Sequence, residues 1–323
     1  MALTIHGAKP ESVFRLYGAD ENSGSFALGW TLEQSPCYLR RVVAAIFGKP
    51  LAIDDAVIAL QKYNEAGGYT DVEIRFANVY HAILEAKRGW DLPGIEQLQR
   101  YHPRLIDGSA KLKRLVSVSM ADKAYAARHL PASLDGVQVV HLAWADLKRL
   151  AEQALKEASR FEEKLWLRQL MQHFQEFITM DRQTDNNVFV VSLTRRPLVE
   201  GRPRIYVDVV EQDCCYFHLV GKHWPVEPPN YVGFRYDGKL QSVHHVESFT
   251  VVENLAKYNR LWPVTELDHF VYRLGPPMLP SREVKPGKVF RNARVWCAID
   301  TLLSGAFATI SDARDETKRR LAE

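Results

Sequence analysis

The sequence predicts an α/β domain followed by a β-rich domain. Strand-like and helix-like segments alternate through residues 26–145, an arrangement typical of α/β folds. A long amphipathic stretch follows over 146–180, and short strand-like runs separated by Pro and Gly occupy 181–323. The 323 residues are 46% hydrophobic and 25% charged. This composition excludes a disordered or collagen-like chain, and the length suffices for roughly two domains.

The first predicted element is a helix over residues 26–47. Apolar side chains recur there at helical spacing, and Gly48 and Pro50 end the pattern. Pro36 lies inside this stretch and removes a backbone donor. We therefore expect Pro36 to bend the helix or to restart it.

Four strands follow in the predicted α/β domain. Residues 70–76 alternate polar and apolar side chains with a period of two, and residues 80–86 form a mostly apolar run. These segments predict two neighbouring strands. Residues 115–120 and 137–142 predict two more, with a helix around 122–129 between them. The first domain is thus assigned to residues 1–145.

Residues 146–180 are predicted to form a helical connector. Apolar residues recur at steps of three and four through this stretch, and charged residues occupy the other faces. The pattern fits one long helix or a pair of helices.

The last domain, residues 181–323, is predicted to be a small β-barrel or sandwich with a terminal helix. Asp237-Gly238 signals a tight hairpin turn. The predicted strands are 188–193, 205–210, 216–220, 231–236, 243–252 and 270–274.

Charge and cysteine content limit the possible partners and compartment. Lys and Arg outnumber Asp and Glu by only 42 to 39, so a polyanion would need a local basic surface. No apolar run approaches the roughly 20 residues of a membrane span, and the first residues lack a signal-peptide pattern. We expect a cytoplasmic protein without a membrane partner. Its cysteines are few and unevenly spaced, which indicates reduced thiols: Cys37, Cys214, Cys215 and Cys297.

The segment that indicates chemistry is residues 69–101. Asp71 opens one predicted strand, and Glu85 ends the next, 14 positions later. Glu85 and Lys87 lie two apart and project to the same face, where an Asp from the adjacent strand can join them. Two carboxylates beside a lysine suit Mg²⁺, which commonly takes one or two carboxylates plus waters and substrate phosphate oxygens. Such an ion neutralises developing charge, so these residues indicate phosphodiester hydrolysis.

This arrangement resembles the PD-(D/E)XK nuclease superfamily. Its mark is an Asp at the start of one core strand and a Glu/Asp-x-Lys tripeptide on the next. The stretch from Gln97 to Tyr101 is similar to the Q-x-x-x-Y helix motif of the RecB-like branch, and helical spacing puts these two side chains on one face. The resemblance covers roughly residues 26–145. It implies a restriction-endonuclease-like mixed sheet flanked by helices.

The resemblance also implies residue roles. Asp71 and Glu85 would bind the metal with help from the Ala86 carbonyl oxygen, and Lys87 would orient the attacking water or stabilise the transition state. The expected metal is Mg²⁺, for which Mn²⁺ can substitute.

Three further residues bear on the resemblance. Glu33, in the predicted first helix, lies where many members carry an acidic residue that supports the metal. Thr70 stands before Asp71 where the motif often has proline. This departure leaves Glu73, on the same strand face, as a substitute for Asp71.

Structural interpretations compete with these functional ones. Charged residues at strand ends are commonly solvated, although a carboxylate that follows the apolar run 82–84 is costly without a partner. Gln97 and Tyr101 also fit ordinary exposed helix positions.

A zinc site is disfavoured because adjacent cysteines are not the usual chelate; its candidate ligands are Cys214, Cys215, His218 and His223.

The last domain combines aromatic residues with basic ones, including Arg195, Arg196 and Arg235. Aromatic faces beside positive charge can stack bases and hold phosphates. This favours a specificity or sensor module, either a PUA-like barrel that reads a base or a pocket for a small nucleotide. The helical connector could carry a homodimer interface.

We therefore expect a Mg²⁺-dependent nuclease, specifically a DNA endonuclease of microbial defence or repair. DNA is the expected partner, with RNA or a small nucleotide as alternatives. Two other functions remain open. One is an effector nuclease activated by a nucleotide second messenger, and the other is a nucleic-acid-binding protein that does not cleave.

Overall fold

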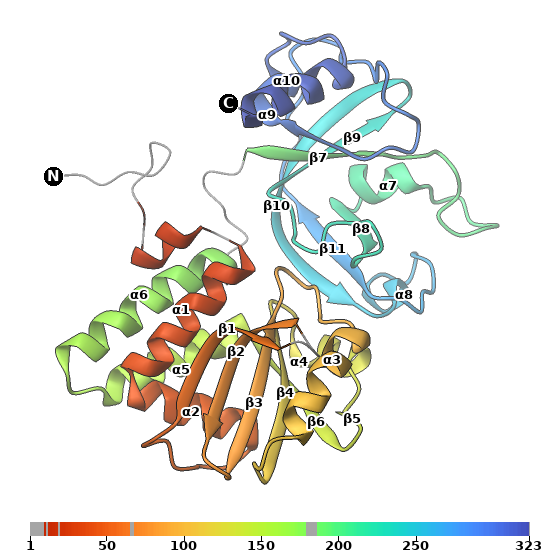
Figure 1. Cartoon of the computed structure of the whole chain (residues 1–323). Coiled ribbons are helices and arrows are strands. Elements are labelled where there is room, and N and C mark those ends of the chain that lie inside the picture. Colours follow the sequence, from red (N-terminus) through yellow and green to blue (C-terminus); the bar gives the residue numbers. More distant parts are fainter. Residues whose placement is uncertain (1–9, 11, 19, 65–67, 179–185, 323) are drawn as a thin grey trace, which may run out of the picture. The chain divides into compact units, whose positions relative to one another are not determined.

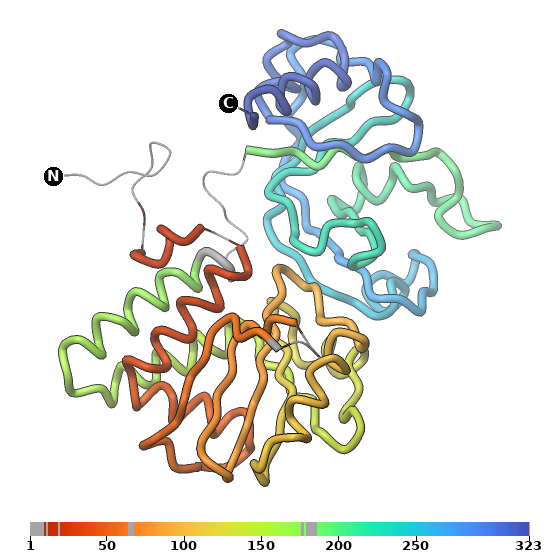
Figure 2. Tube along the Cα trace, viewed as in Figure 1, coloured from red at the N-terminus to blue at the C-terminus, as the bar shows by residue number. Residues whose placement is uncertain are grey.

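The chain divides into two compact units, residues 1–179 and 180–323. The computed structural model describes residues 10, 12–18, 20–64, 68–178 and 186–322 (Figure 1). Each unit contains a six-stranded mixed sheet flanked by helices. Figure 2 shows the path of the chain through each unit.

The first unit is an α/β structure, as the sequence predicts. Its sheet has the order β1-β2-β3-β4-β6-β5. Strand β2 runs antiparallel to both β1 and β3, whereas β3, β4 and β6 run parallel to one another. The elements are η1 (Val13–Tyr17), α1 (Glu21–Gln34), α2 (Pro36–Phe47), β1 (Val57–Asn64), β2 (Gly68–Phe76), β3 (Tyr80–Ala86), α3 (Ile95–Ile106), β4 (Leu112–Ser119), α4 (Lys123–His129), β5 (Ser133–Leu134), β6 (Val137–Ala143), α5 (Trp144–Glu157) and α6 (Phe161–Ile178).

Pro36 restarts the first predicted helix as α2, which confirms the expected interruption. Ser35 caps α2, because its hydroxyl accepts a hydrogen bond from the Tyr38 amide at 3.2 Å. Proline fits the first turn of a helix, where its missing N–H has no intrahelical partner. The chain therefore contains two helices where the sequence showed one apolar pattern.

The sheet of the first unit has an apolar cluster on each face. Leu84 of β3 belongs to the cluster that includes α1, α2, α5 and α6, whereas its neighbour Ile83 belongs to the cluster that includes α3. Adjacent strand residues point to opposite faces, so β3 is covered on both sides. All seven of its residues are buried. A charged side chain on this strand therefore needs a polar partner.

The segment predicted as a connector packs inside the first unit. Helices α5 and α6 contribute Leu147, Ala154 and Leu170 to the same apolar cluster as α1 and α2. The fully buried rings of Trp144 and Phe174 have their centroids 5.1 Å apart. The core of the first unit therefore includes both helices.

The second unit is built on one sheet with the order β12-β7-β9-β10-β11-β8. Strand β7 runs parallel to β9, and the other neighbouring strands are antiparallel. The elements are β7 (Asn187–Ser192), α7 (Tyr206–Glu211), β8 (Cys215–Leu219), β9 (Tyr231–Tyr236), β10 (Lys239–Val252), α8 (Leu255–Tyr258), β11 (His269–Leu274), β12 (Val295–Ala298), α9 (Ile299–Leu303) and α10 (Ile310–Ala322).

Two predictions for the second unit need correction. The strand pairs in the described residues form one sheet with β12 and β8 at its edges, rather than a closed barrel or a two-sheet sandwich. The long strand β10 pairs with β9 along its first half and with β11 along its second half, which joins all strands in a single sheet. Residues 205–210 form mainly the helix α7 instead of a strand. The Asp208 carboxylate accepts the Ile205 amide at 2.9 Å and so fixes the start of this helix.

The predicted hairpin turn at Asp237-Gly238 is confirmed. Both residues have positive φ, 50° and 77°, and Lys239 pairs with Tyr236. Positive φ at both central residues is the geometry of a type I′ turn, which Asp-Gly adopts readily.

None of the helices in the described part of the chain combines the length and apolar character that crossing a membrane requires.

Phe174→Ala should lower the free energy of unfolding of the first unit by about 3–5 kcal/mol, because it removes a fully buried ring. Urea denaturation followed by tryptophan fluorescence measures this change. Leu165→Ala on the same helix is the control, since Leu165 is 40% exposed and the expected change is below about 1 kcal/mol. Equal effects of the two substitutions would contradict the packing of α6 in this core.

Candidate active site

Asp71 and Glu85 lie opposite each other on neighbouring strands. The antiparallel register pairs Val72 with Leu84, and one further step places Asp71 across from Glu85. The Ala86 amide donates to Asp71 Oδ2 at 2.8 Å, which ties this carboxylate to the end of β3. The pairing of β2 with β3 thus brings together two carboxylates that are distant in the sequence.

Three side chains bind the Glu85 carboxylate. Lys87 Nζ lies 2.7 Å from Oε1, Gln97 Nε2 donates to the same oxygen, and the Tyr101 hydroxyl lies 2.7 Å from Oε2. Gln97 and Tyr101 are four residues apart on α3 and face the sheet together. Glu85 is itself only 3% exposed, so these donors offset the free-energy cost of its burial.

Lys87 is held at the end of β3 by its backbone. Its amide donates to the Val118 carbonyl at 2.7 Å, and its carbonyl accepts from Trp144 Nε1 at 3.2 Å. Its side chain is 17% exposed, and Nζ lies 3.9 Å from Glu21 as well as close to Glu85. The lysine is therefore oriented toward the carboxylates and remains accessible.

The electrostatics of the site are dominated by burial and by like charge. Burial raises the pKa of Asp71 to about 6, and the negative charge of Glu85 adds to this shift. Burial alone would lower the pKa of Lys87, but the hydrogen bond and charge of Glu85 outweigh it and the net pKa is raised. The pKa of Tyr101 is also raised, first by burial and then by Glu85. Lys87 thus stays a cation and Tyr101 stays a hydroxyl donor at neutral pH.

Glu21, rather than Glu33, is the acidic residue of α1 that lies at this site. Glu33 is exposed and follows Glu21 by twelve positions, which is about 18 Å along a helix. The structure therefore does not bring Glu33 to Asp71 and Glu85. Asp20 is the sequence signal that could have indicated Glu21, because aspartate commonly precedes the first residue of a helix. In the structure Asp20 caps α1 by accepting the Ser23 amide at 2.9 Å.

Gln61 is a second site residue that the sequence analysis missed. Its Nε2 lies 3.2 Å from both Asp71 Oδ1 and Asn22 Oδ1, so it links β1 to α1 across the site. Strand β1 was not predicted because most of its side chains are at least partly exposed. The apolar run over residues 56–60 is the signal that could have identified it.

Glu73 belongs to a different cluster and does not take the place of Asp71. Its carboxylate lies 2.6 Å from Arg104, 3.2 Å from His81 and 3.0 Å from the Thr70 hydroxyl. Burial acts to raise the pKa of Glu73, but the hydrogen bond from His81 and the charge of Arg104 outweigh it and the net pKa is lowered. This neutralised cluster has a structural role in joining α3 to β2 and β3.

The side-chain oxygens at this site suit Mg²⁺ but supply only part of its coordination shell. Among the described residues, no three His, Cys, Asp or Glu side chains converge on one point that could hold a metal ion. The pair of Asp71 and Glu85 supplies two hard oxygen donors, and the raised pKa of Asp71 marks negative charge that a cation would neutralise. Mg²⁺ commonly binds through one or two carboxylates and completes its shell with water and substrate oxygens. The residues present therefore fit this ion.

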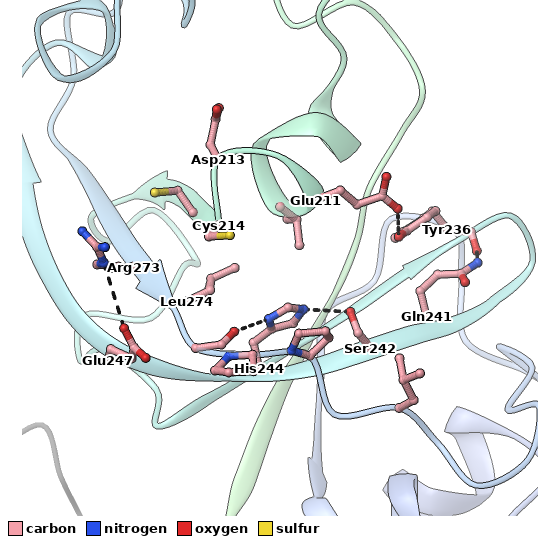
Figure 3. A pocket seen from close by; sticks show the side chains of 16 residues that line it. Glu211, Asp213, Cys214, Tyr236, Gln241, Ser242, His244, Glu247, Arg273 and Leu274 are labelled. Atoms are coloured by element: carbon pink, nitrogen blue, oxygen red, sulfur yellow. Dashed lines mark hydrogen bonds and ion pairs between the residues drawn. The ribbon is translucent and has the colours of Figure 1, made fainter.

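His218, one of the candidate zinc ligands of the second unit, has another partner. His218 is buried, and its Nε2 lies 2.7 Å from the Tyr272 hydroxyl. Cys214 lines a separate cavity of about 670 Å³, shown in Figure 3. Acidic side chains dominate the charged lining of this cavity, in which Glu211 accepts from the Tyr236 hydroxyl and Glu247 lies 4.0 Å from Arg273.

Comparisons of the chain with protein-family models, with curated proteins and with solved structures find no match. The chemistry assigned to this site therefore rests on its residues and their geometry.

Asp71→Asn should stabilise the protein when no metal is present. The pKa of Asp71 is about 6 in the folded chain against an ordinary 3.8, so the folded state holds a proton that the unfolded state releases. Stability is therefore lost as the pH rises between these values and stays lower above them. The pKa difference corresponds to at most about 3 kcal/mol. We expect Asp71→Asn to raise the free energy of unfolding by about 1–3 kcal/mol above about pH 7 in EDTA.

Urea denaturation across a pH series measures this effect, and the advantage of the variant should disappear below about pH 4. Added Mg²⁺ should raise the melting temperature of the wild type and leave that of Asp71→Asn unchanged. A variant less stable than the wild type at neutral pH would show that burial and the charge of Glu85 do not disfavour the ionised Asp71 carboxylate.

Proposed function

We propose that the first unit is a Mg²⁺-dependent nuclease that hydrolyses phosphodiester bonds, with DNA as its substrate. The observation that carries this proposal is the meeting of Asp71 and Glu85 on neighbouring strands with the Lys87 ammonium group beside them. The mixed sheet with helices on both faces is compatible with a restriction-endonuclease-like domain.

Each residue has a distinct role in this proposal. Asp71 and Glu85 would hold the ion together with the Ala86 carbonyl, and Mn²⁺ would replace Mg²⁺ at the same donors. The bound ion neutralises charge on the phosphate and lowers the pKa of water. Lys87 donates hydrogen bonds to the phosphate or to the attacking water.

Gln97 and Tyr101 are positioning residues in this mechanism. Both donate to the Glu85 carboxylate, and neither needs to touch the substrate. Their contacts fix the direction of the Glu85 oxygens, which a metal site requires for a defined geometry.

Exposed aromatic side chains beside the site favour a nucleic acid as the substrate. Tyr63 and Tyr69 are 59% and 61% exposed, and their ring centroids lie 5.1 Å apart. The Tyr101 hydroxyl oxygen, which donates to Glu85, also lies 3.0 Å from the Tyr69 carbonyl oxygen, and this contact places the tyrosine pair next to Glu85. Base-stacking surfaces next to a phosphate-directed site are typical of proteins that bind nucleic-acid strands.

A second candidate function is an effector nuclease activated by a small nucleotide. The observation that favours it is a cavity of the second unit whose lining is rich in arginine and could hold such a ligand. Such a protein would not cleave DNA until the nucleotide is added. A protein that only binds nucleic acid would remain inactive with every nucleotide, and its binding would survive Asp71→Ala.

Glu85→Gln should reduce DNA cleavage at least about 100-fold, because it removes a negative metal ligand while keeping the side-chain shape. Asp71→Ala and Lys87→Ala should have comparable effects. Cleavage of plasmid, linear and single-stranded DNA and of RNA with Mg²⁺, Mn²⁺ or EDTA measures the activity. Glu96→Gln is the matched control, since Glu96 is exposed on α3 next to Gln97, and it should cleave like the wild type. Cleavage by purified Glu85→Gln at the wild-type rate would refute the proposal.

Glu21→Gln and Glu33→Gln distinguish the two acidic residues of α1. Glu21 lies 3.9 Å from Lys87 Nζ, whereas Glu33 is exposed farther along the helix. We expect Glu21→Gln to lower the cleavage rate several-fold, because it changes the charge that holds Lys87. Glu33→Gln should leave the rate within about twofold of the wild type. Cleavage rates measured at saturating Mg²⁺ test this. A larger loss of rate in Glu33→Gln than in Glu21→Gln would restore the expected role of Glu33.

A further inference from the structure

The second unit contains a cavity of about 820 Å³ with a strongly basic lining. The segment after β7, the turn between β9 and β10 and the loop before β12 form its walls. Asp237 is the one acidic residue among the lining residues. The five cationic residues of the lining are Arg195, Arg196, Arg235, Lys239 and Arg291.

Only part of this positive charge is neutralised by the protein. Arg195 forms a two-point contact with Asp237, with distances of 3.0 and 2.6 Å, and Lys239 lies 4.0 Å from Glu283. Within the described residues, the remaining three arginines have no carboxylate within ion-pair distance. The cavity therefore has an excess of positive charge even though the whole chain is nearly neutral.

Arg235 is the least expected of these cations because it is only 4% exposed. Its Nη2 lies 2.6, 2.9 and 2.8 Å from the carbonyl oxygens of Phe290, Arg291 and Ala293, which share its two N–H groups. Its Nε is buried and has no hydrogen-bond partner in the described structure. A buried guanidinium balanced only by carbonyl dipoles is costly unless an anion meets it.

We propose that this cavity binds a phosphate group carried by a nucleotide, either free or within a nucleic-acid strand. Arg235 lies in the wall of the cavity, and Arg196 and Arg291 approach from its exposed rim. Arginine is suited to this role because its planar fork of donors matches phosphate oxygens.

A neighbouring aromatic residue points to a nucleotide rather than to a simple inorganic anion. Phe290 is 84% exposed, and its carbonyl accepts from Arg235. An exposed ring next to a phosphate site can stack a base. The other cavity of this unit, shown in Figure 3, does not fit a phosphate, since its acidic residues Glu211, Asp213 and Glu247 outnumber Arg273.

The inference goes beyond the proposed nuclease activity and does not depend on it. The test uses the full chain carrying Glu85→Gln in EDTA, so that cleavage does not interfere. Fluorescence anisotropy measures the binding of labelled single-stranded DNA and of labelled ATP over a range of salt concentrations. Inorganic phosphate serves as the competitor. The cavity variant is Arg196→Gln/Arg291→Gln, and the charge-matched control is Arg260→Gln/Lys318→Gln, which changes two exposed cations of the same unit outside the cavity lining.

We expect the cavity variant to bind about tenfold more weakly. The slope of its log affinity against log salt concentration should fall by an amount that corresponds to the loss of up to about two phosphate contacts. The control should bind within about twofold of its parent. Loss of DNA binding identifies a strand as the source of the phosphate, and loss of ATP binding alone identifies a free nucleotide. Equal binding by the cavity variant and the control, for both probes, would overturn the proposal. A first unit that failed to cleave DNA would leave this comparison unaffected, because both variants carry Glu85→Gln.

Discussion

The structure of the first unit depends on the close approach of Asp71 and Glu85 across two antiparallel strands. Like charges in this position repel each other, and burial of Asp71 strengthens the effect. A strand that needed only stability would carry apolar residues at both positions. Lys87, directly after β3, and Gln97 and Tyr101 of α3 instead provide donors to Glu85. The protein thus tolerates excess negative charge at a defined point, which is what binding a divalent cation requires.

The elements far from these carboxylates explain why their geometry is fixed. Trp144, at the start of α5, donates to the Lys87 carbonyl and packs on Phe174 of α6. The core that these helices form therefore holds the end of β3 in place. On the opposite face, Glu73 joins Arg104 of α3 to β2. Because α3 also carries Tyr101, this buried ion pair fixes the helix that orients Glu85.

The second unit shows the same physical situation with the opposite sign of charge. Arg235 is buried on β9, where no carboxylate of the described residues pairs with it, and its cavity is rich in arginine. An uncompensated buried charge is unfavourable in a folded chain and is usually retained for binding. One unit thus concentrates negative charge suited to a metal ion, and the other concentrates positive charge suited to a phosphate. The proposed nuclease activity depends on the first of these sites, and the proposed phosphate binding depends on the second.

The sequence by itself determined the strands that carry Asp71 and Glu85, the restart of the helix at Pro36 and the turn at Asp237-Gly238, because each depends on local periodicity or backbone preference. It also placed Gln97 and Tyr101 on one helix face. Only the tertiary structure decided that Glu21 and not Glu33 approaches Lys87, and that Gln61 reaches Asp71. These contacts depend on how α1 packs against the sheet and how β1 pairs with β2, and such contacts join residues that share no local pattern. The helix at residues 206–211 has a local explanation instead, since the Asp208 carboxylate accepts the Ile205 amide at the helix start and outweighs the β preference of the valines.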